Sequence, residues 1–366
     1  MLLPVLLILA GLALLVFGGE LLVRGATNLA SIAKVDPLIV GLTVVAFGTS
    51  APEMAVCLQA TLSGQPDIAM GNVVGSNIAN ILLILGACAA ASPLVVNTRL
   101  VRLDVPVMIA ASLALFALAI KGHLNRIDGG ILLSGLVFYL CWLFIQSRRE
   151  KRLGAVPNRM DSTDTPIKAS MLNVSLQFLY LVISVAILVG GSNLLVNGAS
   201  QIARVLGVSD LVIGLTAVSV GTSLPELAAC LMAVLRGRRD LAVGNCVGSN
   251  ILNILAVLGI TGVVAPEGVN VSLHALQSDI PIMIVVAFAC LPVFASGGRI
   301  NRWEGCLFLA YFLLYYGWLF LLNTNASVSE IYAFTITVFI LPLTVITFSV
   351  ITYRSFLAKK RRETLK

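Results

Sequence analysis

Two glutamates, Glu53 and Glu226, lie in apolar segments that are long enough to cross a lipid bilayer. A single carboxylate that stays charged at that depth is costly, so an isolated one would take up a proton. Two facing carboxylates can instead share a divalent cation, which cancels both charges. The pair therefore predicts an intramembrane cation site to which each glutamate contributes one carboxylate.

Hydroxyl and amide residues accompany both glutamates. Gly48, Thr49 and Ser50 precede Pro52 and Glu53, and the same pattern precedes Glu226. Serine and asparagine then recur four residues apart, on one face of a helix, at positions Ser76, Asn80, Ser249 and Asn253. For Asn72, Asn77, Asn245 and Asn250, hydrogen bonding between helices is an equal alternative to ion binding. Oxygen ligands of these kinds suit hard cations such as calcium or sodium, and not soft metals.

Both motifs belong to one duplicated segment. Residues 41–86 recur at 214–259 without a gap, and 29 of the 46 positions are identical. In each copy a proline follows Gly-Thr-Ser near the middle of a long apolar run. Proline suits the first turn of a helix, so Pro52 predicts that the helix breaks there and that preceding carbonyls are freed for a cation.

The composition is that of a polytopic membrane protein, with a mean hydropathy of +1.00 and 11% charged residues. Seven cysteines without CxxC spacing predict neither disulfides nor a zinc framework. Eleven membrane helices are predicted near residues 2–23, 37–63, 68–92, 103–120, 127–146, 171–196, 209–235, 240–265, 280–296, 303–322 and 331–353. With the N-terminus outside and the C-terminus in the cytoplasm, 21 of the 24 Lys and Arg residues face the cytoplasm.

An odd number of crossings separates the two copies, so they enter the membrane from opposite sides. The predicted fold is an all-α polytopic membrane protein with two inverted five-helix repeats and one extra C-terminal transmembrane helix. The first repeat covers residues 1–146, a short cytoplasmic linker covers 147–169, and the second repeat covers 170–323. Residues 324–366 form the extra helix and a basic tail. Inverted halves with matching polar interruptions are typical of transporters.

At these motifs the chain resembles the sodium/calcium exchangers of the calcium/cation antiporter superfamily, and specifically their short bacterial members. The resemblance implies ligands from each broken helix and from the helix that follows it. These are Thr49, Ser50, Glu53, Ser76, Asn80, Thr222, Ser223, Glu226, Ser249 and Asn253, together with the backbone carbonyls of Ala46 and Ser219. It also implies that helices 2–23 and 171–196 slide across a fixed core to alternate access.

Differences from relatives favour sodium as the coupling ion. Potassium-dependent exchangers tend to carry aspartate where this chain has Glu226 and Asn253. Proton-coupled calcium exchangers carry glutamate where this chain has Gly75 and Gly248.

The expected function is exchange of calcium for sodium by alternating access, in a bacterial cytoplasmic (inner) membrane. A calcium/proton or other cation/proton antiporter is the alternative within transport, and a cation channel is the alternative from another class. An enzyme is not expected, because HExxH is missing from the sequence and no histidine accompanies Ser50 or Ser223. The expected partners are calcium and sodium ions and membrane lipid. No cofactor, nucleic acid or obligatory protein partner is expected.

Overall fold

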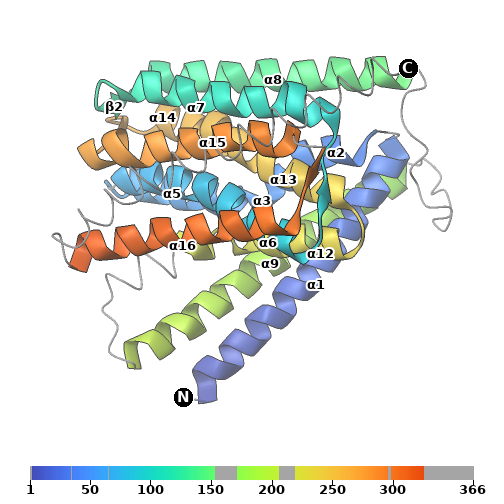
Figure 1. Ribbon diagram of the computed structural model, residues 1–366, viewed down its shortest axis with the longest axis horizontal. Coiled ribbons are helices and arrows are strands. Elements are labelled where there is room, and N and C mark those ends of the chain that lie inside the picture. Colours follow the sequence, from blue (N-terminus) through green and yellow to red (C-terminus); the bar gives the residue numbers. More distant parts are fainter. Residues whose placement is uncertain are drawn as a thin grey trace, which may run out of the picture.

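The computed structural model describes residues 2–33, 35–64, 66–152, 171–205, 219–295 and 298–324. These residues form a helical bundle with two short β-ribbons at its edges (Figure 1). The first half contains, in order, α1 (Leu2–Ala33), α2 (Pro37–Val40), the π-helix η1 (Gly41–Val45), α3 (Ala46–Thr49), α4 (Ala51–Leu62), α5 (Pro66–Ala79), the π-helix η2 (Asn80–Leu85), α6 (Gly86–Ala91), β1 (Leu94–Val95), the π-helix η3 (Leu100–Asp104), α7 (Val105–Ala119), β2 (His123–Leu124) and α8 (Arg126–Arg152).

Where it is described, the second half repeats this order. It contains α9 (Met171–Val205), α11 (Ser219–Gly221), α12 (Leu224–Leu235), α13 (Arg239–Leu252), the π-helix η5 (Asn253–Leu258), α14 (Gly259–Val264), β3 (Val269–Asn270), the π-helix η6 (Ala275–Asp279), α15 (Ile280–Ala295), β4 (Arg299–Ile300) and α16 (Arg302–Thr324). The π-helices η2 and η3 fall at the same places in the first half as η5 and η6 in the second, as the sequence duplication leads one to expect.

Within the described residues, seven helices are long and apolar enough to cross a membrane, and a bent pair of helices, Pro37–Thr49 with Ala51–Leu62, forms an eighth crossing. The crossing predicted at 209–235 is described only from Ser219 onward, and α16 covers the one predicted at 303–322. Residues 153–169 of the predicted linker and the extra helix at 331–353 lie outside the described residues. The division into domains therefore remains a prediction for those parts. Residues 147–152, predicted as the start of the linker, instead continue helix α8 to Arg152.

Several helix ends differ from their predicted positions, and within the described residues the largest differences are at the ends of α1 and α9. The first helix continues to Ala33 and not to residue 23, and α9 continues to Val205. A helix of 32 residues spans about 48 Å, which exceeds a hydrocarbon core of about 30 Å, so α1 has to tilt. Figure 1 shows α1 and α9 running side by side and inclined to the rest of the bundle. Hydropathy alone missed these extensions because they contain polar residues.

Glycines bring α1 and α9 together. A side chain at Gly11 would lie 2.7 Å from the carbonyl oxygen of Gly191, and one at Gly198 would lie 2.6 Å from the carbonyl oxygen of Pro4. Gly18 faces Leu188, so residue numbers along α9 fall as those of their contacts along α1 rise. The two helices are therefore antiparallel, as inverted repeats require.

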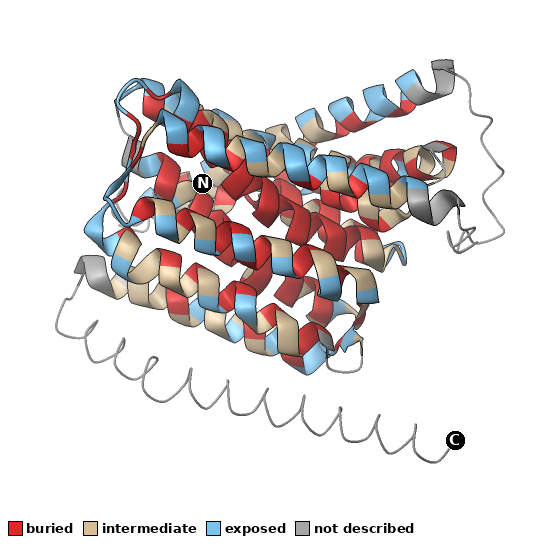
Figure 2. Ribbon diagram, turned by 90° about the horizontal axis from the view of Figure 1, so that it is seen from above, coloured by how far each residue is buried: buried red, intermediate tan, exposed pale blue. Residues whose placement is uncertain are grey.

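The helices that carry the serine and asparagine stripe form the centre of the bundle. In the most apolar 18-residue stretch of each span, buried residues make up 78% within Ile68–Ala91 and 83% within Arg239–Val264, against 28% within α1 and within α9. Figure 2 shows this contrast between the buried central helices and the more exposed outer ones. The outer surface is rich in large apolar side chains such as Leu9, Phe138 and Phe178, as a lipid-facing surface should be.

Two short β-ribbons connect the halves, and one tyrosine–aspartate hydrogen bond occurs in each half. Strand β1 pairs antiparallel with β4, and β2 pairs antiparallel with β3, so each ribbon takes one strand from each half. The hydroxyl of Tyr139 donates to Asp104 at 3.2 Å, and that of Tyr315 donates to Asp279 at 3.0 Å. The halves are thus equivalent in structure and connected at two edges of the bundle.

Candidate cation-binding site

The helix break predicted from Pro52 is confirmed. Helix α3 ends at Thr49, Ser50 leaves the helical conformation with ψ near 6°, and α4 starts at Ala51 with an axis turned by 41°. Ser223 has the same backbone conformation before α12, with ψ near 1°. In both halves the proline occupies the first turn of the new helix, where its missing N–H leaves no bond unmade.

The two glutamates lie in the first turns of α4 and α12, and each is only 1% exposed. The helix N-terminus favours negative charge there. Each glutamate is hydrogen-bonded to the serine of the opposite half. The hydroxyl of Ser50 donates to Oε1 of Glu226 at 3.4 Å, and the hydroxyl of Ser223 donates to Oε1 of Glu53 at 3.4 Å. The structure thus brings together the two carboxyl groups that the sequence places 173 residues apart.

Six side-chain oxygens of this site are buried and have no hydrogen-bond partner among the described residues. Each half supplies three of them: one carboxylate, one hydroxyl and one amide oxygen. They are Oε2 of Glu53 and Glu226, Oγ of Ser76 and Ser249, and Oδ1 of Asn80 and Asn253. Buried polar atoms are rarely left unpaired, so such a group of oxygens marks a place for a ligand that accepts their lone pairs. A hard cation has this property.

The amide groups of Asn80 and Asn253 are held by a second asparagine pair. The Nδ2 of Asn80 donates to Oδ1 of Asn250 at 3.0 Å, and the Nδ2 of Asn253 donates to Oδ1 of Asn77 at 3.2 Å. Asn77 and Asn250 also donate to each other's backbone carbonyl at 3.3 Å. Because the NH₂ groups are used in this way, the amide oxygens of Asn80 and Asn253 remain free for the cation.

The threonines are oriented by a third pair of asparagines. The hydroxyl of Thr49 donates to Oδ1 of Asn245 at 3.3 Å, and that of Thr222 donates to Oδ1 of Asn72 at 3.4 Å. The sequence left the roles of Asn72, Asn77, Asn245 and Asn250 open between helix packing and ion binding. The structure shows all four bonded across the halves to predicted ligands, so they connect helices and orient ligands at the same time.

The two backbone carbonyls predicted as ligands differ from the side-chain oxygens, because the one that the structure describes already accepts hydrogen bonds. The Ala46 carbonyl accepts the Ser50 N–H at 3.0 Å and the Thr49 hydroxyl at 3.4 Å. The break after Ser50 therefore does not leave this carbonyl without a partner, contrary to the argument from Pro52. Ser219 is the first residue of α11, and its side chain lies outside the described part of the structure. The roles of Ala46 and Ser219 as ligands remain predictions.

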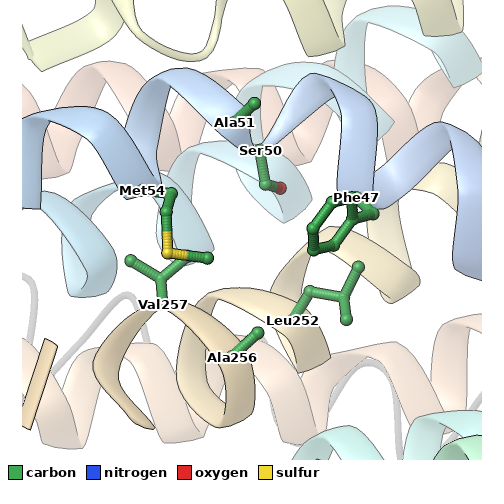
Figure 3. Close-up of a pocket in the computed structure, with 7 residues that line it drawn as sticks. All are labelled: Phe47, Ser50, Ala51, Met54, Leu252, Ala256 and Val257. Atoms are coloured by element: carbon green, nitrogen blue, oxygen red, sulfur yellow. The ribbon is translucent and has the colours of Figure 1, made fainter. Parts of the chain in front are cut away.

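A cavity of about 80 Å³ lies against Ser50, between α3 and α4 on one side and α13 and η5 on the other (Figure 3). Apart from Ser50 its walls are apolar, with Phe47, Met54 and Leu252 among the lining residues. By this measure about 10–15 Å³ is enough to hold one water molecule, so the space has room for water. Open space therefore adjoins one predicted ligand, while both carboxyl groups themselves are closed off from solvent.

The chemistry of the site is that of oxygen ligands only. Two carboxylates provide two negative charges, and hydroxyl and amide oxygens complete the set without adding charge. No group of three or more His, Cys, Asp or Glu side chains suited to a metal occurs in the described ranges of the chain. The arrangement thus offers the oxygen ligands and the two negative charges that a hard cation requires.

The sequence matches a family of membrane exchangers and several of its members. The family described as "Sodium/calcium exchanger protein" matches residues 3–145 and 176–321. The "Putative antiporter CaxA" of Alkalimonas amylolytica is 39% identical over 319 residues, which cover 86% of this chain and 98% of that protein. The "Sodium/calcium exchanger MaX1" of Methanosarcina acetivorans is 31% identical over 342 residues, covering 85% and 96%.

A solved structure shares the fold. The sodium-calcium exchanger NCX_Mj, soaked with Na⁺ and Sr²⁺, superimposes with a TM-score of 0.72 at 30% identity, covering 86% of this chain and 97% of that one. Fold, site and relatives together define an integral membrane cation antiporter built from two inverted repeats. The chain belongs to the sodium/calcium exchanger family.

Proposed function

We propose that this chain exchanges calcium for sodium by alternating access. The observation that supports this most directly is the set of six unpartnered oxygens around two buried carboxyl groups. Two carboxylates cancel the charge of one calcium ion, and the same two charges can be balanced by monovalent ions after calcium leaves. Exchange follows if α1 and α9 cannot slide across the site while it is empty and charged, because they would then cover two uncompensated charges with apolar surface.

Sodium is proposed as the coupling ion for two reasons. Gly75 and Gly248 stand where proton-coupled relatives carry glutamate, as the sequence resemblance implied. The relative MaX1 is named a sodium/calcium exchanger. Protons remain the alternative coupling ion, since two carboxyl groups could also be neutralised by protonation.

We further propose the bacterial inner membrane as the location, with the N-terminus outside. The relative YrbG of Escherichia coli, 36% identical over 292 residues, is named an inner membrane protein. The Lys and Arg distribution supports a cytoplasmic C-terminus. A fluorescent protein that matures only in the cytoplasm, fused to the C-terminus, should fluoresce; a dark fusion together with an active periplasmic reporter at the same place would contradict this orientation.

The function is tested by calcium uptake into everted membrane vesicles under an imposed sodium gradient. Glu53→Gln and Glu226→Gln should each abolish uptake, because one negative charge of the pair is lost. Glu267→Gln is the matched control, since this exposed carboxylate lies in the loop before β3, outside the helices that carry the predicted ligands, and should not matter. Sodium-driven uptake that persists in both site variants would refute the proposal.

The same vesicles separate the alternatives. Uptake driven by a pH gradient without sodium would establish proton coupling. Calcium flux that needs no counter-ion gradient would indicate a channel.

A further inference from the structure

Four cysteines from four helices gather behind α12, the helix that carries Glu226. They are Cys88 of α6, Cys230 of α12, Cys246 of α13 and Cys290 of α15, all at most 1% exposed. The sulfur atoms of Cys230 and Cys246 are 3.7 Å apart. Cys88 lies beside Cys230, and Cys290 lies near Cys246.

This pair of thiols is present in one half only. Cys57 occupies the position of Cys230 in the first half, but Val73 stands where the second half has Cys246. Apolar packing at this place is therefore satisfied by valine, and a second thiol is not needed for the fold. At this position the chain thus compares a valine in one half with a second thiol in the other.

The distance between the sulfurs fits a ligand that binds both. Two thiolates on one tetrahedral ion lie about 3.8 Å apart, given a metal–sulfur distance of about 2.3 Å. Sulfur donors select soft elements. Since the described residues offer no group of three or more ligands for a metal here, the best fit is an element that two sulfurs satisfy. Trivalent arsenic has this preference.

The pair is connected to the cation site by hydrogen bonds. The Nδ2 of Asn245 donates to the sulfur of Cys230 at 3.2 Å, and Oδ1 of the same amide accepts from Thr49 at 3.3 Å. Cys230 also lies one helical turn after Glu226. An adduct on Cys230 would take the sulfur away from Asn245 and disturb the orientation of the Thr49 hydroxyl.

We propose that Cys230 and Cys246 form a buried dithiol that binds trivalent arsenic and thereby inhibits transport. Arsenous acid is neutral and small enough to reach a buried site. In the reaction two As–O bonds and two S–H bonds break, two As–S bonds form, and two water molecules leave. No electrons are transferred. The proposal depends on the proposed function only for its transport measurement.

The test uses phenylarsine oxide, a neutral trivalent arsenical, with the full-length protein. In purified protein, intact mass should show one adduct per chain. In vesicles, uptake should fall about tenfold or more, as expected when the partner of a ligand is disturbed. A small dithiol such as 2,3-dimercaptopropanol should reverse both effects, and a monothiol should not.

Two variants locate the site. Cys246→Val copies the first half and should lose both the adduct and the inhibition. Cys57→Val removes the equivalent single thiol of the first half and should keep both the adduct and the inhibition. Its inhibition is measured against the uptake rate of the same variant without the arsenical. An unchanged adduct in Cys246→Val would overturn the site, and an adduct that leaves uptake unaffected would overturn the coupling. Because mass needs no transport, failure of the proposed function would be recognised separately.

Discussion

Replacing Asn250 by leucine is predicted to weaken calcium binding although Asn250 itself is not a predicted ligand. Its Oδ1 accepts from Asn80 at 3.0 Å, and its Nδ2 donates to the Asn77 carbonyl at 3.3 Å. Leucine has a similar volume but removes both bonds. The buried NH₂ of Asn80 then lacks its partner, at a cost of about 1–3 kcal/mol unless the amide rotates.

Rotation of that amide would satisfy the NH₂ group only by turning it toward the cation site. The amide oxygen of Asn80 would then be lost as a ligand. Loss of the hydrogen-bond partner that orients a metal ligand typically lowers metal affinity by about 10–100-fold, which is about 1.4–2.7 kcal/mol. The calcium concentration for half-maximal uptake should rise by this factor, whereas the maximal rate should change much less.

The assay is uptake of radioactive calcium into vesicles over a range of calcium concentrations. Asn77→Leu is the matched variant, because Asn77 holds Asn253 in the same way at 3.2 Å. Both variants should shift half-saturation by similar factors. Asn250→Ser, whose hydroxyl is too short to reach Asn80, should do the same without adding an apolar side chain. Half-saturation within about twofold of the unchanged protein in all three would refute this account of ligand orientation.

Two further predictions concern packing and surface charge. Gly248→Ala would place its new carbon 2.6 Å from the Leu42 carbonyl oxygen, so thermal unfolding should show a loss of about 1–3 kcal/mol in stability. Gly130→Ala has open space around the new carbon and should show no loss of stability. Equal melting temperatures of the two variants would contradict the close helix contact at Gly248. Glu20 accepts from Arg24 and Arg236 at 2.6 Å, but both arginines are more than half exposed. Glu20→Gln should therefore cost at most about 1 kcal/mol, and the loss should vanish at high salt; a larger, salt-independent loss would contradict this.

Local chemistry made much of the site predictable. The break at Ser50 follows from Pro52 and the residues before it, and the pairing of Glu53 with Glu226 follows from the cost of isolated charges in lipid. The inverted arrangement follows from the repeat and the charge distribution. These features depend on interactions between residues close in the sequence or on the internal repeat, and both can be read from the sequence.

Contacts across the halves could not be predicted in the same way. Asn77 and Asn250 differ from Asn80 and Asn253 only in where they point after α5 and α13 have packed together. The additional bond from Arg236 to Glu20 joins residues 216 positions apart, whereas the sequence suggested only the local pair with Arg24. The pairing of Ala46 also depends on local backbone geometry that the presence of Pro52 does not determine.

The exchange of serines between the halves has a consequence for biosynthesis. Glu53 is synthesised in the first half of the chain, but the hydroxyl that donates to it belongs to Ser223 in the second half. In the same way, strand β1 can pair only after β4, Arg299–Ile300, has been synthesised. While the ribosome is still making the second half, the first half is in the membrane with an unfinished polar surface. The early half must therefore keep Glu53 protonated or hydrated until its partner arrives, so assembly of the cation site is a late step that follows insertion of both halves.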